Sequence, residues 1–228
     1  MSEHTLAIEG STYAGSVTLL SDYEVIAERT LADSGIPSRS GRDERVLPSV
    51  AECLAEAGVE VTEITRIVCG AGPGSFTSLR ISASVAKGIA VGVGCPVYSV
   101  SSLLLSIAST PNAMKDDGLF LSVLPAMRAE WFALLADVQG GIITPRGDAF
   151  IVGEAELAET ARRHEARLLG PRQEIVAAPH ARGVATLLGQ ILASGPVPID
   201  TWEPDYGRLA EAQVKWEAAH GRPLAAGA

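Results

Sequence analysis

The sequence predicts an α/β fold made of two lobes, and three observations indicate it. A hydrophobic share of 47% in 228 residues is enough to build a sizeable core. The chain begins with short apolar runs bounded by polar turns, a pattern typical of strands. Further runs of this kind then alternate with longer stretches of helical periodicity. A polar loop from Thr110 to Gly118 then divides the chain into two parts that repeat this order.

In the first part, three strands precede any helix. Asp43 is expected to cap the first helix, and Gly58 to end it. The order β-β-β-α-β-α-β-α is that of one actin-like (ribonuclease H-like) half, whereas Rossmann units would alternate from the start. We expect strands at residues 5–8, 16–20, 25–31, 67–69 and 96–100, and helices at 43–57, 77–91 and 101–109.

The second part reads as a shortened copy of the first. Its expected strands lie at 119–124, 130–137, 149–152 and 168–169, and its helices at 154–163, 180–193 and 206–219. We therefore predict a duplicated actin-like (ASKHA) fold with a degenerate second lobe. The first lobe should span residues 1–109 and the second 110–205, with the C-terminal segment 206–228 packed back on the first.

Composition narrows the classes of function. Eighteen basic against 27 acidic residues give a net charge of −9, which argues against autonomous binding of nucleic acid, because Lys and Arg supply most of that affinity. No apolar run reaches the roughly 18 residues that cross a bilayer, and the start of the chain does not resemble a signal peptide. The three cysteines form no CxxC pair and are expected to be reduced. We expect a cytoplasmic protein without a membrane segment.

The strongest local feature is the glycine-rich turn Gly70–Ser75, which joins a strand to a helix. Two interpretations stay open: free backbone N–H groups at the helix start that bind an anion, or a tight turn that lets Phe76 enter the core. It is not a Walker loop, since no Lys follows the last Gly. Ser75 or Thr77 is expected to cap the helix, and Gly74 to hold a positive φ. The candidate residues of this site are Gly72, Pro73, Gly74, Ser75, Phe76, Thr77 and Arg80.

The run GPGSFTSLRI at residues 72–81 closely resembles the GPGSFTGLRIG signature of the TsaB (YeaZ) family. Weaker matches occur in order along nearly the whole chain, and they lie at residues 6–12, 42–48, 128–132 and 204–208. The resemblance implies an inactive actin-fold relative of the enzyme TsaD. Such proteins pair with TsaD and the ATPase TsaE to place threonylcarbamoyl on the adenosine beside the anticodon of tRNAs that read ANN codons.

The same resemblance implies no cofactor of its own for this chain. ATP and metal are expected on the partner subunits, and tRNA is expected to be reached only through the complex. The chain departs from the family where Glu9 replaces Asp, Gly10 replaces Thr, Arg42 replaces His, Ser78 replaces Gly and Pro125 replaces Asp. Actin-fold ATPases place acidic groups at the ends of both first strands, which a proline cannot provide. These departures favour a non-catalytic chain.

Three other functions have less support in the sequence. A kinase or ATPase of this fold needs a phosphate hairpin in each lobe, and Leu124–Arg128 offers none. A peptidase lacks support, because the four histidines form no HExxH motif and Ser75 does not lie in a GxSxG elbow. A freestanding RNA-binding protein is disfavoured by the charge.

The helices at 43–57 and 77–91 carry more apolar residues than one core-facing stripe needs. The resemblance implies that these helices pair with the equivalent two of TsaD, and the same face would allow a homodimer when the partner is absent. The candidate interface residues are Leu47, Val50, Leu54, Ile81, Val85 and Ile89. Val50, Leu54, Val85 and Ile89 in particular are expected to form an exposed patch.

Overall fold

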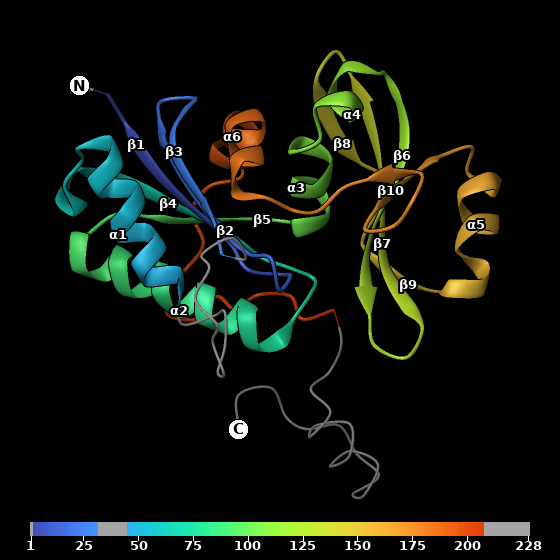
Figure 1. Cartoon of the computed structure of the whole chain (residues 1–228), viewed down its shortest axis with the longest axis horizontal. Helices are drawn as coiled ribbons and strands as arrows, with labels where there is room; N and C mark the ends of the chain where they lie inside the picture. Colours follow the sequence, from blue (N-terminus) through green and yellow to red (C-terminus); the bar gives the residue numbers. More distant parts are fainter. Residues whose placement is uncertain (1, 32–44, 208–228) are drawn as a thin grey trace, which may run out of the picture.

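The computed structural model describes residues 2–31 and 45–207, which form two β-sheets with helices packed on them (Figure 1). The first sheet and its helices comprise β1 (His4–Glu9), β2 (Ser16–Ser21), β3 (Glu24–Thr30), α1 (Val46–Ala57), the 3-10 turn η2 (Val61–Glu63), β4 (Ile64–Gly70), α2 (Phe76–Val93) and β5 (Val97–Val100). With the helix Ser102–Ala108, which follows β5, these elements confirm the order predicted for the first half.

The first sheet has the strand order β3-β2-β1-β4-β5. β1 pairs antiparallel with β2 and parallel with β4, so it is the central strand. Leu6 and Ile8 face α1 and α2, whereas Ala7 faces the opposite side of the sheet. This alternation follows from the period of two along a strand, and it buries both faces of β1.

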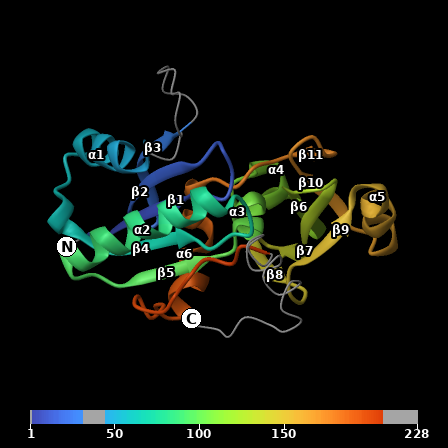
Figure 2. The same ribbon diagram turned by 90° about the horizontal axis from the view of Figure 1, so that it is seen from below.

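α1 and α2 lie side by side on one face of the first sheet (Figures 1 and 2). α1 ends at Gly58, which has a φ of 65° and confirms the predicted stop. α2 ends at Val93, two residues after the expected end at residue 91. It is followed by Gly94, which has a φ of 79°. The predicted cap, Asp43, lies outside the described residues; Arg45 is the residue before the first turn.

The second half contains α3 (Ser102–Ala108), α4 (Pro111–Lys115), β6 (Gly118–Ala126), β7 (Glu130–Gln139), β8 (Ile142–Pro145), β9 (Phe150–Gly153), α5 (Glu154–Arg163), β10 (Arg167–Gly170), β11 (Ile175–Val176), the 3-10 turn η3 (Ala181–Gly183) and α6 (Val184–Ala193). Its sheet has the order β8-β7-β6-β10-β11, and β9 also pairs with β7. The order repeats that of the first sheet, with β6 in the place of β1. Only residues 171–174 join β10 to β11, so no counterpart of α2 is present there.

One hydrophobic cluster joins the two sheets. It contains Ala7 and Val68 of the first sheet, Phe120 and Ala136 of the second, and apolar residues of α3 and α6. α3 packs on β6 and β7, and α6 packs on β5, so these helices fill the space between the sheets (Figure 1). The lobes therefore share part of their core.

The predicted division at residue 110 stays a prediction. Residues before it contact the second sheet, and residues after it contact the first sheet. α3 precedes residue 110 but packs on the second sheet. Ala181, far beyond that residue, donates its backbone N–H to Ser16 Oγ at 2.9 Å. The segment 197–205 likewise returns to the first sheet, where Val197 N donates to Val97 O at 2.8 Å.

Several elements differ from the sequence prediction. The expected loop 110–118 contains α4, which starts with Pro111 at its first position and buries Ala113. β8 and β11 were not predicted because they are only four and two residues long, although each pairs with the strand directly before it in the chain. The helix expected from Tyr206 is wrong at its start: Tyr206 and Gly207 are not helical, and the remainder lies outside the described residues. Within residues 2–31 and 45–207, no helix is long and apolar enough to cross a membrane.

His180 is a titratable contact between the two halves of the chain. Its Nε2 lies 3.3 Å from Thr30 Oγ1 on β3, and its Nδ1 accepts the backbone N–H of Arg182 at 3.1 Å. Burial, together with the nearby Arg182 charge, lowers the pKa of His180 to about 4. The folded protein therefore favours the neutral ring.

We predict that His180 makes the protein less stable in mild acid. Its pKa is lower folded than unfolded, so the unfolded state binds more protons between pH 6.5 and about 4, and the free energy of unfolding falls as the pH falls through that window. His180→Asn keeps an acceptor for Arg182 N but does not titrate, and urea unfolding at pH 7 and pH 5 should show a smaller loss in this variant. The exposed His164→Asn is the matched control. An equal loss in wild type and His180→Asn would contradict the prediction.

Candidate functional site

The candidate site lies at the carboxyl ends of β1 and β4, where the glycine-rich turn leads into α2. Glu9 is the last residue of β1, and its side chain is fully buried. Its Oε1 accepts the backbone N–H of Ser11 at 2.5 Å, and its Oε2 accepts Ser102 Oγ at 2.9 Å. Both carboxylate oxygens are thus bonded by donors of the protein itself.

Ser102 connects Glu9 to the turn before α2. Its Oγ accepts the backbone N–H of Gly72 at 3.1 Å, and its own N–H donates to Gly72 O at 2.8 Å. Because Ser102 is the first residue of α3, the carboxylate joins β1, the start of α3 and the turn through one chain of hydrogen bonds. Such a chain holds each member in one orientation.

The surroundings of Glu9 leave little space for a ligand. A Cβ at Gly70 would collide with Glu9 Oε2, so the main chain of β4 lies directly against the carboxylate. Burial raises the pKa of Glu9, while the hydrogen bonds from Ser11 and Ser102 oppose that rise. The group is therefore built into the structure and not open to solvent.

Two glycines of the turn are required for different reasons. Gly72 has a φ of 89°, and a Cβ there would collide with the carbonyl oxygen of Asp205. Gly74 has no positive φ, so the prediction for it is wrong. A Cβ at Gly74 would instead collide with the backbone of Ser11, whose carbonyl accepts Ser75 N at 2.8 Å. The Gly72-Pro73 peptide bond is cis.

The start of α2 also differs from the prediction. Ser75 occupies the cap position but makes no side-chain cap; its Oγ pairs with Ser78 Oγ at 2.9 Å, and Thr77 lies within the helix. Phe76 is 41% exposed, so the expectation that it enters the core is wrong. Its ring centroid lies 4.5 Å from that of Tyr206, and the guanidinium of Arg80 lies 5.3 Å from it. Anion binding at this helix start stays a prediction.

The corresponding end of β6 carries no acidic side chain on the strand. Pro125 pairs with Trp131 across the hairpin, and the following turn contains Arg128 and Ala129 with φ of 66° and 57°. Across the described part of the chain, no three or more His, Cys, Asp or Glu side chains gather as metal ligands would.

The α1–α2 face was predicted as an interface, and its residues divide into two groups. Val50 and Leu54 are buried against the first sheet at 2% and 9% exposure, so the expectation that they are exposed is wrong. They lie on the side of α1 that packs on β2 and β3. Ile81, Val85 and Ile89 are half-buried against the same core, and Leu47 is 56% exposed.

The exposed part of α1 and α2 includes several small side chains, beside exposed larger residues such as Glu52, Glu56 and Val91. Ala51 and Ala55 of α1 and Ser84 and Gly88 of α2 are exposed, and a Cβ at Gly88 would meet no atom within 4 Å. We define the α1–α2 face by these residues together with Leu47. Whether it binds a partner stays a prediction.

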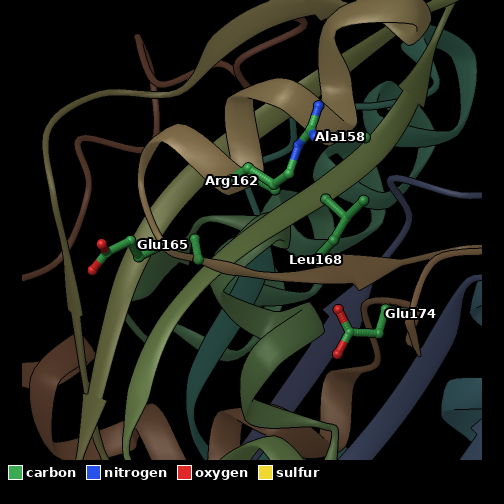
Figure 3. A pocket seen from close by; sticks show the side chains of 7 residues that line it. Ala158, Arg162, Glu165, Leu168 and Glu174 are labelled. Carbon is green, nitrogen blue, oxygen red and sulfur yellow. The ribbon is translucent and has the colours of Figure 1, made fainter.

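A separate hollow of about 450 Å³ lies on the second lobe between α5 and β10 (Figure 3). It is lined by alanines and Leu168 and by the charged residues Arg162, Glu165 and Glu174. None of the predicted site residues lines it.

Sequence reasoning missed Ser11, Ser102 and Asp205 as parts of the site. Ser102 is 93 residues from Glu9, and no local pattern links the two. The serine pair at 101–102 before an apolar run does indicate a helix start, which could have drawn attention to it.

Comparisons with known proteins cover up to 92% of the chain. Residues 25–128 match the family model described as TsaD: tRNA N6-adenosine threonylcarbamoyltransferase. The chain is 28% identical to the tRNA threonylcarbamoyladenosine biosynthesis protein TsaB of Bacillus subtilis (strain 168), over 92% of this chain and 96% of that protein. It is 37% identical to the protein of the same name from Escherichia coli (strain K12), over 43% of this chain and 40% of that protein.

The fold is similar to a crystal structure from Pseudomonas aeruginosa, described as an uncharacterized protein with similarity to peptidase YEAZ. The TM-score is 0.74 at 26% identity, over 90% of this chain and all of that one. Together with the mixed sheets described above, this likeness confirms the predicted actin-like α/β fold.

We predict that Gly72→Ala lowers the free energy of unfolding by about 1–3 kcal/mol, because its φ of 89° disfavours a side chain and the Asp205 carbonyl blocks the new methyl group. Gly92→Ala is the control, since this helical position of α2 is open and the change should add up to about 1 kcal/mol of stability. Denaturant unfolding measures both. A Gly72→Ala protein as stable as wild type would show that the turn does not need its glycine.

Proposed function

Because the chain belongs to the TsaB (YeaZ) family, we propose that it is a non-catalytic subunit of the assembly that makes N6-threonylcarbamoyladenosine in tRNA, where it pairs with and activates a TsaD-type enzyme. The B. subtilis relative is named for this biosynthesis and aligns along almost its whole length. The alignment to the E. coli relative spans about two fifths of that protein.

The state of Glu9 is the observation that carries the non-catalytic role. A carboxylate that works in catalysis must reach a metal, a water molecule or the substrate. Here both oxygens of Glu9 are bonded by Ser11 and Ser102, and the side chain is fully buried. At the matching end of β6 stands Pro125. This pair of observations supports a scaffold over a kinase, an ATPase or a peptidase.

The α1–α2 face is the surface that we assign to the TsaD-type partner. Helices pack with their axes about 8–10 Å apart, and the smaller the side chains at the contact the closer they approach. Ala51, Ala55, Ser84 and Gly88 provide small side chains on two adjacent helices. Two helices of the partner would complete a four-helix contact there, and a second copy of this chain would use the same face when the partner is absent.

The remaining components belong to the partners in this proposal. ATP and metal are held by the TsaD-type and TsaE-type subunits, and this chain needs no cofactor. The net charge of −9 supports the proposal that tRNA is reached only through the complex. The assembly is placed in the cytoplasm.

We predict that Gly88→Arg abolishes pairing with the TsaD homologue of the same organism and leaves the fold intact. The position is exposed and open in the free chain, but docking would bury the new charge. An unpaired buried charge costs several kcal/mol, against about 8 kcal/mol for a micromolar complex, so the affinity should fall by at least about 100-fold. Size-exclusion chromatography of co-expressed pairs measures the loss.

Gly189→Arg is the matched control, because Gly189 is equally exposed and open but lies on α6, away from the α1–α2 face. It should leave pairing unchanged. Circular dichroism establishes that both variants are folded. If Gly88→Arg pairs as well as Gly189→Arg, the partner binds elsewhere.

A further inference from the structure

The segment after α6 runs along α2 in the opposite direction (Figure 1, red). We call residues 197–207 the C-terminal strap. Val197 N bonds to Val97 O at the start of β5, and Lys87 Nζ, near the middle of α2, donates to Trp202 O at 2.5 Å. The strap thus contacts the strand that follows α2 and then the helix itself.

The strap then forms a hydrogen bond with the turn that precedes α2. Asp205 N donates to Ala71 O at 2.7 Å, and the Asp205 carbonyl occupies the space beside Gly72 where a side chain would be. The next residue, Tyr206, places its ring against Phe76 with the centroids 4.5 Å apart. The first turn of α2 is therefore held by both backbone and ring contacts.

The strap ends against the second sheet. Gly207 has a φ of 68°, and its N–H donates to Asp205 Oδ1 at 2.7 Å, which folds the chain sharply after Tyr206. A Cβ at Gly207 would collide with the ring of Phe132 on β7. The strap therefore links the start of α2 to the second lobe.

α2 has few strong contacts of its own at this end. Its cap residue makes no side-chain cap, and Phe76 is 41% exposed. Apart from Leu79, the buried residues of the helix are the small Ser78, Ser82, Ala83, Ala86 and Ala90. Small side chains bury little apolar area, and stabilisation by burial is roughly proportional to that area. The rings of the strap supply contact that the helix itself lacks.

We propose that the C-terminal strap sets the position of α2 on the first sheet and that Tyr206 is a positioning residue for partner docking on the α1–α2 face. The docking part rests on the proposed function; the effect on α2 does not. Tyr206 acts through Phe76 and the first turn, while the exposed positions Ser84 and Gly88 lie further along the same helix.

Hydrogen exchange of the free protein tests the effect on α2. Tyr206→Ala removes the ring pair, so amides of residues 79–83 should exchange about threefold to tenfold faster. Tyr206→Phe keeps the ring and should exchange as wild type. Tyr23→Ala, at an exposed tyrosine between β2 and β3, is the matched control. If Tyr206→Ala does not fold, Phe76→Leu removes the other ring of the pair and should give the same acceleration.

The affinity for the TsaD homologue, measured by calorimetry on the same variants, tests the docking part. Tyr206→Ala should weaken binding about threefold to tenfold, and Tyr206→Phe should restore it. Weaker binding with unchanged exchange in α2 would overturn positioning, since Tyr206 would then contact the partner directly. Faster exchange with unchanged affinity would overturn the docking part. A wild-type chain that does not bind the homologue would contradict the proposed function, and the exchange rates would still decide whether the strap holds α2.

Discussion

The buried carboxylate of Glu9 is the interaction on which the rest of the arrangement depends. Burying a charged or polar group without partners costs several kcal/mol, so this side chain must be bonded wherever it is placed. The carboxylate accepts hydrogen bonds from the backbone N–H of Ser11 and the hydroxyl of Ser102. Ser102 Oγ in turn accepts the backbone N–H of Gly72. The end of β1, the start of α3 and the turn before α2 therefore hold one another in place. The turn also carries the strap, through the bond from Asp205 N to Ala71 O.

In the function that we propose, this carboxylate holds the structure together and does not act on a substrate. The hydrophobic cluster that joins both sheets through α3 and α6 ties the lobes together from inside, and the strap ties α2 to Phe132. Lobes joined in this way favour a fixed outer surface over a cleft that opens and closes. We assign function to that surface, the α1–α2 face, and not to the ends of the strands.

The sequence predicted the features that depend on neighbours along the chain. The order of strands and helices along the first half, the end of α1 at Gly58 and the helix after the glycine-rich turn all follow from periodicity and turn residues. The sequence prediction failed where contacts between residues far apart in the chain determine the structure. The ring of Phe76 lies against that of Tyr206, 130 residues later, and not in the core, and Gly74 is needed because Ser11 lies against it. Val50 and Leu54 could not be assigned to the core without knowing which side of α1 meets β2 and β3.

The most direct test of the non-catalytic account is threonylcarbamoyl transfer to tRNA by the reconstituted partner enzymes, with wild-type chain or with Glu9→Gln. The glutamine still accepts Ser11 N but cannot accept the Ser102 hydroxyl, so some loss of stability is expected. With folding confirmed by circular dichroism and pairing by co-elution, the account predicts the same rate of modification for both proteins. A folded, paired Glu9→Gln chain whose rate falls by about 100-fold or more, the scale of a lost acid–base group, would show that this carboxylate takes part in the chemistry.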